Sequence, residues 1–513
     1  MPSVFQRKIS AVKDAIATGD FDGAASKLEL LGLTESMAVG QIKKIRYLRL
    51  KVFNRLQWLI EGSAVVVEFQ DCQDILAEEY LEIALFYVLS GQIEQAECFM
   101  RQAIALDKRS VLFASELAIL FEQQGEREKA LAIYNKILAS MLARNKIDAV
   151  GARVLNRLAG LRSLDDTEII KISSLCSKYA DGELGVRLLF GLSKCYSKVA
   201  DINSEIACLE KANRLADQLN ECQLGAQTVE TSRLRLRAIR LLFDEAAPSW
   251  MPDYPTSDQS PVFILGMPRS GTTLLEQILG AHSSIGNAGE SRAMGIAFKR
   301  RLLNKATLPE DKGSDLPFLR YKTLDQEDGK AIIDYYDRYQ ALFSDKTVIT
   351  DKELSNIDRV GIILRLYPKA KFICVRRHPL DVCASIMQQD FSIAYFSASS
   401  IKIAKEYEIY YDKAMHWQNI FPRAMITIEY ETLVSDFEKT TLTLMDLLGL
   451  PWEDAISRFY ERGNSVRTPS LSQVRSPINS MAIGKWMRYR KLLQPAEDYL
   501  VARGLLLEPN EKI

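Results

Sequence analysis

The sequence predicts a solenoid of helical repeats followed by an α/β domain with a central parallel sheet. Three observations lead to this fold class. Amphipathic helical patterns follow one another up to about residue 240, a stretch rich in proline, serine and aspartate interrupts them, and short β-rich runs then alternate with helices. We therefore expect helical repeats over residues 1–240, a linker over residues 241–260 and a second domain over residues 261–513.

The helical part contains two segments that repeat with a period of 34 residues. This period, with small residues where paired helices approach closely, is typical of tetratricopeptide repeats, whose concave groove usually binds a peptide or a partner domain. Gly19 and Ala24 show the same five-residue step, and a weaker copy is expected near residues 207–212. A plain bundle of similar helices is the alternative. The repeated positions are Ile83, Ala84, Gly91, Ala96 and Ala103, which return as Leu117, Ala118, Gly125, Ala130 and Ile137.

The bulk composition is that of an ordinary globular protein and argues against several classes of partner. Of 513 residues, 47% are apolar and 26% charged, and 66 basic residues balance 66 acidic ones. Zero net charge argues against nucleic acid as a partner, because domains that bind it usually carry a basic excess. No signal peptide and no run of about 18 apolar residues is visible, so we expect a cytoplasmic chain without a membrane span. The eight cysteines and three histidines lack the spacing of metal ligands, so reduced thiols and no metal are expected.

Four β-rich runs follow the linker, and helical stretches separate them. This alternation predicts a parallel sheet with helices on both faces. The runs are Val262–Leu265, Thr347–Thr350, Lys371–Val375 and Met425–Ile428, with helical stretches at Leu274–Leu279 and Asp381–Gln389 among those between them.

The first strand leads directly into a glycine-bounded loop, and a helix follows. Units of this kind point backbone N–H groups and the positive end of a helix at an anion, so we expect a P-loop-like phosphate site. A nucleotide triphosphatase needs lysine where Thr272 stands, and this chain carries Arg269 inside the loop instead. A degenerate kinase loop is the alternative. The loop residues are Gly266, Met267, Pro268, Arg269, Ser270, Gly271, Thr272 and Thr273.

Residues 268–273 (PRSGTT) resemble the 5′-phosphosulfate-binding loop of sulfotransferases, especially of the tyrosylprotein sulfotransferase branch. The resemblance covers about residues 261–490 and implies that the donor is 3′-phosphoadenosine 5′-phosphosulfate (PAPS). The helical array in front is similar to that of repeat-fused sulfotransferases, and it differs from the membrane-anchored, luminal tyrosylprotein enzymes. This difference concerns the compartment and the acceptor and leaves the donor assignment unchanged.

Two further segments resemble parts of the family's nucleotide site. Arg377 at a strand end and Ser385 eight residues later match the 3′-phosphate motif, and both side chains offer charge-assisted hydrogen bonds to a phosphate. Tyr430 matches a tyrosine in a family segment that leads to the nucleotide. Lys485 and Trp486 resemble the C-terminal lid, in which lysine reaches a phosphate and tryptophan shields adenine. Roles in packing or on the surface are the alternatives for these residues.

Sulfuryl transfer requires in-line geometry, stabilisation of charge on the departing oxygen and a base for the acceptor hydroxyl. Glu290 lies 21 residues after Arg269, as the base does in the tyrosylprotein enzymes, so it is the candidate base. Lys352 matches the family lysine that stabilises the leaving oxygen, and Arg269 would share that task. A solvated glutamate and a surface lysine are the alternatives.

Four residues near these motifs have weaker assignments. Either Ser470 or Ser472 could add a hydrogen-bond donor to the site. Arg292 could orient an acidic acceptor. His282 resembles a family histidine after the first helix, and we interpret it as structural.

The sequence therefore predicts a PAPS-dependent sulfotransferase that acts on a hydroxyl-bearing acceptor. Protein tyrosine is attractive as the acceptor, since the repeat groove would bind a peptide or protein, and carbohydrates, lipids and small metabolites stay open as acceptors. Two alternatives stay open. One is a P-loop kinase of small molecules, and the other is a repeat scaffold whose transferase domain is inactive.

Overall fold

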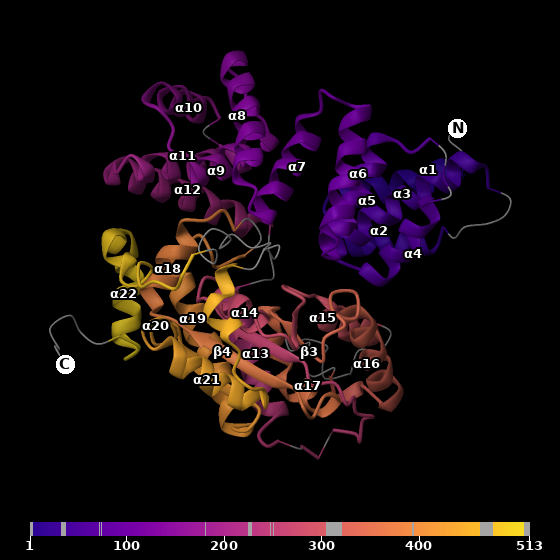
Figure 1. The fold of residues 1–513 in the computed structure, drawn as a ribbon, viewed down its shortest axis with the longest axis vertical. Coiled ribbons are helices and arrows are strands. Elements are labelled where there is room, and N and C mark those ends of the chain that lie inside the picture. Colours follow the sequence, from indigo (N-terminus) through magenta and orange to yellow (C-terminus); the bar gives the residue numbers. More distant parts are fainter. Residues whose placement is uncertain are drawn as a thin grey trace. The chain divides into compact units, whose positions relative to one another are not determined.

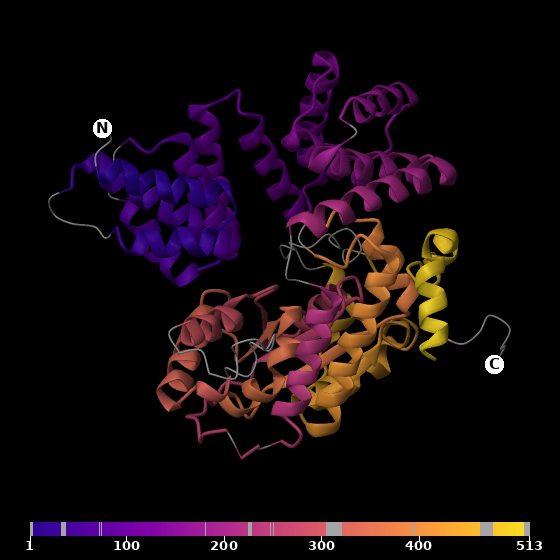
Figure 2. The same cartoon turned by 180° about the vertical axis from the view of Figure 1, so that it is seen from behind.

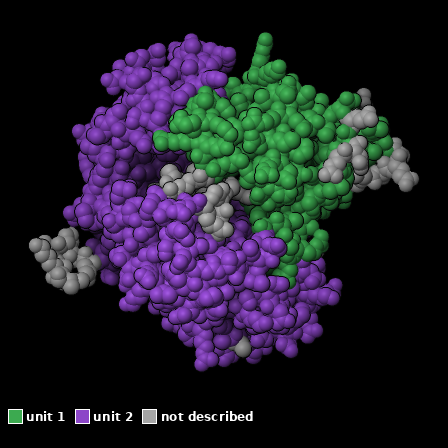
Figure 3. All heavy atoms as spheres, viewed as in Figure 1, with its two compact units in different colours: residues 1–133, 335–343 green, residues 134–334, 344–513 purple. Residues whose placement is uncertain are grey.

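A computed structural model of the chain describes residues 4–31, 37–70, 72, 74–179, 181–223, 228–246, 248–249, 251–303, 321–391, 394–461 and 476–506. The chain divides into two compact units (Figure 3). One unit comprises residues 1–133 and 335–343, and the other comprises residues 134–334 and 344–513. These divisions differ from the domain boundaries expected at 240 and 260, which stay a prediction.

The first unit is built from helices that pair with their neighbours in sequence (Figure 1). Helix α1 packs against α2, α3 against α4, and α5 against α6. Buried alanines such as Ala84, Ala96 and Ala103 let these helices approach closely. The bounds are α1 Val4–Ala17, α2 Phe21–Glu29, α3 Val39–Leu56, α4 Leu59–Gln70, α5 Ala77–Leu89, α6 Ile93–Leu106 and α7 Val111–Gln124, after which α8 spans Arg127–Arg144.

The turns between these helices share one backbone geometry. At Gly19, Gly91 and Gly125 the φ angle is positive, at 79°, 81° and 87°. The N–H of each of these glycines binds the carbonyl three residues earlier, and the next N–H binds the carbonyl five residues earlier. This pattern ends a helix in the left-handed conformation that glycine adopts without strain. The repeated glycines of the sequence therefore mark repeated turns.

The structure adds a copy of this turn that the sequence pattern did not reveal. Gln57, with φ 57°, makes the same two hydrogen bonds and lies 34 residues before Gly91. Gly62 then stands where Ala96 stands in the next copy, and a Cβ there would lie 3.0 Å from the ring of Phe86. A glutamine in the turn hid this copy. The helical region is thus repeat-like, and its assignment to tetratricopeptide repeats stays a prediction.

The second unit begins with further helices and continues into the sheet. Helix α11 packs against both α9 and α12, and α13 packs against α19. Within the described residues, none of the helices is both long and apolar enough to cross a bilayer. The bounds of this group are α9 Ala149–Leu161, α10 Asp166–Lys178, α11 Gly182–Lys198, α12 Ile202–Gln223 and α13 Val229–Leu242.

A five-stranded parallel sheet with the order β2-β3-β1-β4-β5 forms the centre of the second unit. The four expected strands are confirmed, and β2 is an additional short edge strand. Because the order reverses between β1 and β4, their carboxyl ends border the crevice where open α/β sheets bind ligands. The bounds are β1 Val262–Gly266, β2 Ile285–Asn287, β3 Val348–Asp351, β4 Lys371–Arg376 and β5 Met425–Glu429.

An apolar core joins β1, β4 and β5 to helices α14, α20 and α21. The strands β1 and β4 are runs of mostly buried apolar residues, as expected for the centre of a parallel sheet. Figure 2 shows the helices around the sheet from behind. The bounds are α14 Thr272–Gly280, α15 Ala293–Leu303, α16 Gln326–Gln340, η3 Leu354–Arg359, α17 Val360–Leu366, α18 Pro379–Met387, α19 Ser400–Ile420, α20 Tyr430–Ser435, α21 Phe437–Leu448, η4 Asp454–Glu461, η5 Lys485–Tyr489 and α22 Arg490–Ala502.

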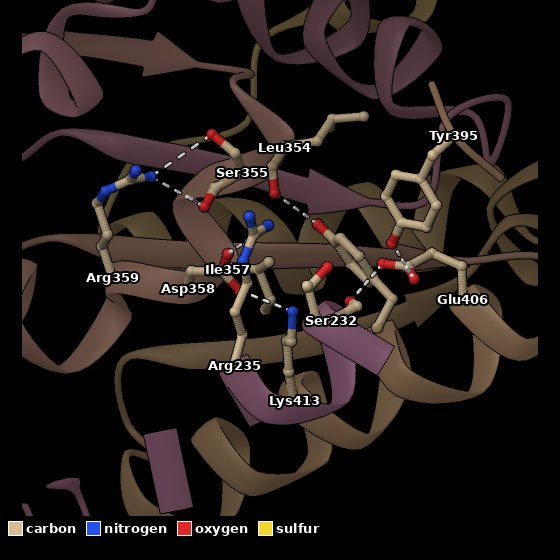
Figure 4. A network of polar contacts seen from close by, with 12 residues as sticks. Ser232, Arg235, Leu354, Ser355, Ile357, Asp358, Arg359, Tyr395, Glu406 and Lys413 are labelled. Carbon is tan, nitrogen blue, oxygen red and sulfur yellow. Dashed lines mark hydrogen bonds and ion pairs between the residues drawn. The ribbon is translucent and has the colours of Figure 1, made fainter. Parts of the chain in front are cut away.

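A polar network ties α13 to α19 and to the 3-10 helix η3 (Figure 4). The Ser232 hydroxyl donates to Glu406 at 2.7 Å. On η3, Asp358 accepts a hydrogen bond from Lys413 of α19 at 2.8 Å and lies 4.0 Å from Arg235 of α13. Helix α13, which the sequence places with the repeats, thus packs on the α/β part of the second unit.

Candidate active site

The loop after β1 is tightly constrained at both of its glycines. Gly266 has φ 148°, and a Cβ on it would lie 2.5 Å from Ser270 Oγ and 2.7 Å from the carbonyl oxygen of Val375. Gly271 has φ 105° and precedes α14, and a Cβ on it would lie 2.5 Å from the ring of Tyr430. No other residue type fits these positions without strain. The loop therefore lies against β4 and α20.

Arg269 connects this loop to the helix that follows β4. Its φ of 70° is left-handed, which is costly for a residue with a side chain. The guanidinium Nε donates to Ser385 Oγ at 2.9 Å, and the carbonyl of Arg269 accepts from Arg377 Nη1 at 3.0 Å. The loop and the Arg377–Ser385 segment, 108 or more residues apart, therefore lie side by side.

The two arginines give this part of the molecule a positive electrostatic character. Burial, together with repulsion from Arg377, lowers the pKa of Arg269 to about 10. An anion placed beside the two guanidinium groups would relieve their mutual repulsion.

Arg377 has further contacts and one unsatisfied donor. Its Nη2 donates to the carbonyl of Ala482 at 2.5 Å, and its guanidinium stacks 4.7 Å from the ring centre of Tyr430. Among the described residues, Arg377 Nε and Ser270 Oγ are buried without a hydrogen-bond partner. Buried polar groups are rarely left unpaired, so these two atoms indicate a polar ligand.

A cavity of about 200 Å³ lies at this point of the fold. It is bordered by the glycine loop, the start of α14, the end of β4 and the residues before η5. Of the residues predicted to bind the donor, Arg269, Gly271, Thr273, Arg377, Tyr430 and Lys485 line it. Ser270 and Thr272 are buried in the loop beside it.

Trp486 is not among the residues that line this cavity. Its indole stacks on the imidazole of His378, with ring centres 5.6 Å apart. Its backbone N–H and that of Gly484 donate to the carboxylate of Asp381 on α18, at 3.0 and 2.8 Å. The structure therefore places Trp486 against the start of the Ser385 helix.

A second cluster, beside the end of β3, joins the predicted base to the predicted lysine. Lys352 Nζ donates to Glu290 Oε1 at 2.9 Å and lies 4.0 Å from Glu276. The lysine side chain is 1% exposed and that of Glu290 is 57% exposed. Burial opposes the charge of Lys352, but the two carboxylates outweigh it, so the pKa of Lys352 is raised. A buried ammonium is thus held charged beside a carboxylate that solvent can reach.

Three tyrosines on one face of α19 hold the backbone of this sheet edge. Tyr407 donates to the carbonyl of Arg377 and Tyr411 to that of Val375, both at 2.8 Å. Tyr410 donates to Leu354 O at 3.0 Å and accepts from the N–H of Gly266 at 2.9 Å. These contacts connect the ends of β1 and β4 to the segment that follows Lys352. The spacing i, i+3, i+4 was a sequence signal for such a face.

Other predicted residues lie outside this arrangement. His282 is buried, and its Nε2 lies 3.0 Å from the carbonyl of Pro451, which fits the structural role expected. Arg292 is exposed and immediately precedes α15. Ser470 and Ser472 lie outside the described residues. Sequence reasoning missed Glu276, whose only signal was a carboxylate within the apolar helix after the loop.

Comparison with known proteins assigns this part of the chain to a family. A model of the sulfotransferase family matches residues 261–454. The protein-tyrosine sulfotransferase 1 of Danio rerio is 25% identical over 242 residues, which are 45% of this chain and 66% of that protein. The C-terminal half is a sulfotransferase-family domain.

Two further similarities extend the comparison. An uncharacterized protein of Aquifex aeolicus (strain VF5) is 32% identical to this chain over 333 residues, covering 63% of this chain and 42% of that protein. The matches thus cover 42% of the Aquifex aeolicus protein and 66% of the Danio rerio protein, so this chain spans about half the length of these relatives. The sulfotransferase domain of the Synechococcus PCC 7002 olefin synthase is 22% identical with a TM-score of 0.34, covering 49% of this chain and 98% of that one.

Proposed function

We propose that this chain transfers a sulfuryl group from PAPS to a hydroxyl group of an acceptor. The observation that carries this proposal is the meeting of Arg269 and Ser385 at 2.9 Å within a sulfotransferase-family domain. A nucleotide with phosphates at its 5′ and 3′ ends requires two anion-binding segments that lie close together. The loop after β1 and the α18 segment meet that requirement.

The residues at the cavity fit a doubly phosphorylated nucleotide. Ser270 Oγ and Arg377 Nε are buried donors without a partner among the described residues. Helix α14 begins at Thr272, directly after Gly271 of the loop, so its first N–H groups add the positive end of a helix. We assign the 5′ side to the loop and the 3′-phosphate to Arg377 and Ser385. When bound, PAPS supplies an activated sulfuryl group. Its transfer breaks the bond between sulfur and the bridging oxygen, which departs as part of the 5′-phosphate.

Glu290 and Lys352 supply the remaining chemistry in this proposal. The exposed carboxylate of Glu290 accepts the proton of the acceptor hydroxyl, a role that typically accelerates a reaction about 10²–10⁴-fold. Lys352 and Arg269 stabilise the negative charge that develops on the departing oxygen. The ion pair between Glu290 and Lys352, at 2.9 Å, holds the carboxylate beside the ammonium, and the raised pKa of Lys352 keeps that ammonium protonated before the acceptor arrives.

A tyrosine side chain of a peptide or protein is the acceptor that we propose. Similarity to proteins named protein-tyrosine sulfotransferases supports it. The repeat-like helices of the first unit would bind such a peptide, in the way that repeat arrays use their concave surfaces. The cytoplasm remains the proposed compartment, and the free thiols of the described cysteines support it.

Nucleotide binding tests the donor assignment. Calorimetry should show that 3′-phosphoadenosine 5′-phosphate (PAP) binds to the full chain and that ATP binds much more weakly. Arg377→Ala should weaken PAP binding about tenfold or more, because a charge-assisted contact is lost. Arg423→Ala is the matched control, since Arg423 is an exposed arginine before β5. Tight ATP binding without PAP binding would instead support a kinase.

Transfer of label from PAPS tests the activity and the acceptor. The chain should label tyrosine-containing peptides and leave their phenylalanine counterparts unlabelled. Labelling of glycans or small metabolites alone would contradict the peptide acceptor and keep the sulfotransferase activity. No transfer to any acceptor by a chain that binds PAP would support a scaffold with an inactive domain.

A further inference from the structure

The residues from Ser476 to Tyr489 form one wall of the donor cavity, and we call them the wall segment. Six of them line the cavity before η5 and a seventh, Lys485, lines it at the start of η5. Most of these residues are exposed or half-buried, and regular structure is confined to η5 and short turns. Their position therefore depends on contacts with the rest of the second unit.

Two of these contacts come from the sulfotransferase domain itself. Arg377 Nη2 donates to the carbonyl of Ala482 at 2.5 Å. Asp381 accepts from the N–H groups of Gly484 and Trp486. Both anchors come from residues at the start of α18 or just before it, which places the wall segment beside the proposed 3′-phosphate site.

The third contact comes from helix α12, outside the family domain. Glu205 is 2% exposed. Its Oε1 accepts from the Tyr489 hydroxyl at 2.7 Å, and its Oε2 accepts from Arg488 Nη2 at 2.5 Å. One buried carboxylate thus binds both residues at the end of the wall segment.

The place of Glu205 in the helical pattern is informative. Ala200, with φ 60°, forms the same turn as Gly91 in the repeats, and the hydrogen bonds are the same. Five residues after that turn the repeats have a buried alanine, such as Ala96, whereas here the residue is Glu205. A residue that packs helices together has been replaced by a carboxylate that reaches another part of the fold.

We propose that Glu205 is a positioning residue for donor binding, through which helix α12 holds the wall segment over the cavity. The inference rests on the proposed donor site. Helix α12 also reaches the other end of α18, because Asn213 Nδ2 donates to the carbonyl of Met387 at 2.8 Å. The same helix therefore fixes both the wall segment and the helix that carries Ser385.

The consequence is a coupling between the helical region and the donor. Ordering a segment costs conformational entropy, and a site that is ordered in advance binds more tightly. Without Glu205, PAP binding would have to order the end of the wall segment itself. Affinity should fall, while turnover at saturating donor should change little, because Glu205 contacts none of the residues assigned to the chemistry.

Calorimetric titration of the full chain with PAP tests the proposal. Glu205→Ala should weaken PAP binding about tenfold, since it removes two hydrogen bonds to one charged group. Glu210→Gln is the matched control, because Glu210 is an exposed glutamate on the same helix, and it should bind PAP like the unaltered chain. With labelled PAPS, KM for the donor should rise by a similar factor and kcat should stay within about twofold.

A second variant keeps the test valid where Glu205→Ala does not fold. Tyr489→Phe removes one hydrogen bond and retains the Glu205–Arg488 pair, and it should weaken PAP binding about threefold. Amide hydrogen exchange without nucleotide should be faster at residues 482–489 in either variant. Unchanged PAP affinity and unchanged exchange in a folded variant would overturn the proposal. Failure of the unaltered chain to bind PAP would overturn the donor assignment. Amide hydrogen exchange in the two variants would still show whether Glu205 orders the wall segment.

Discussion

The helical repeats and the carboxyl edge of the sheet both use left-handed backbone, but they use it under different constraints. At Gly19 no atom lies within 4 Å of the place where a Cβ would stand, and Gln57 occupies the same kind of turn. At Gly266 and Gly271 a Cβ would come within 2.5 Å of Ser270 or Tyr430. The turn at Gly19 therefore depends on local backbone energy, whereas the turns at Gly266 and Gly271 also depend on their neighbours.

The two regions also differ in what holds them together. In the repeats, small buried residues such as Ala96 let the helices pack closely against one another. At the sheet edge, side chains such as Tyr410 and Asp381 bind backbone groups of distant segments. A contact of the second kind defines an atom's position more narrowly, because a hydrogen bond tolerates little change in distance or angle. The edge is thus the part suited to position a reacting group.

The largest effect should come from replacing Glu290, the exposed carboxylate at the carboxyl edge of the sheet. Glu290→Gln should lower kcat about 10²–10⁴-fold, because an amide cannot take the acceptor proton. PAP affinity, measured by calorimetry, should stay within about threefold. Glu438→Gln, on the exposed side of α21, is the control and should keep full activity. Unchanged turnover in Glu290→Gln would refute its role as base.

The polar network that ties α13 to α19 and η3 should contribute to stability in a pH-dependent way. Burial opposes ionisation of Asp358, but Lys413 and Arg235 outweigh it and lower its pKa. Lys413→Met should therefore reduce the free energy of unfolding at pH 7 by about 3 kcal/mol, since a buried carboxylate loses its partner. Urea unfolding measures this loss.

The sign of the pH effect follows from the lowered pKa of Asp358. A carboxyl group whose pKa is lower in the folded chain than in the unfolded chain stabilises the fold at pH values above its unfolded pKa of about 4. That stabilisation disappears as the pH falls through the pKa of the folded chain. The difference between the unaltered chain and Lys413→Met should therefore shrink below about pH 4. A difference that stays constant with pH would contradict this explanation.

The two kinds of glycine should respond differently to one added methyl group. Gly271→Ala should reduce PAP affinity by about 2 kcal/mol, because its Cβ would push the loop away from Tyr430 and the φ angle is strained. Gly19→Ala should cost about 1 kcal/mol of stability and leave PAP affinity unchanged. Thermal unfolding and calorimetry measure the two quantities. Equal effects on PAP binding would remove the contrast between the regions.

The smallest effect should be a gain in stability. Gln57→Gly places glycine in a left-handed turn that now holds glutamine, so strain is relieved, while the more flexible unfolded chain offsets part of the gain. The free energy of unfolding should rise by about 0.5 kcal/mol. A loss of stability would mean that the glutamine side chain contributes contacts that the turn requires.

Much of the fold could be predicted because its signals are local. The strand Val262–Gly266 is an unbroken apolar run before a glycine loop, and the 34-residue period shows in glycine and alanine positions. The strand Ile285–Asn287 was missed because three residues carry no recognisable pattern. The repeat at Gln57 was missed because its turn depends on a backbone conformation that glutamine rarely adopts.

By itself, the sequence determined the parallel sheet, the glycine-bounded loop and the repeating helices, because each depends on residues that are neighbours along the chain. Only the tertiary structure decided which distant side chains meet. It paired Glu290 with Lys352, 62 residues away, and Glu205 with Tyr489, 284 residues away. Such pairs arise where segments that are far apart in the sequence pack together. The whole core sets the geometry of that packing, and no short pattern of residues encodes that geometry.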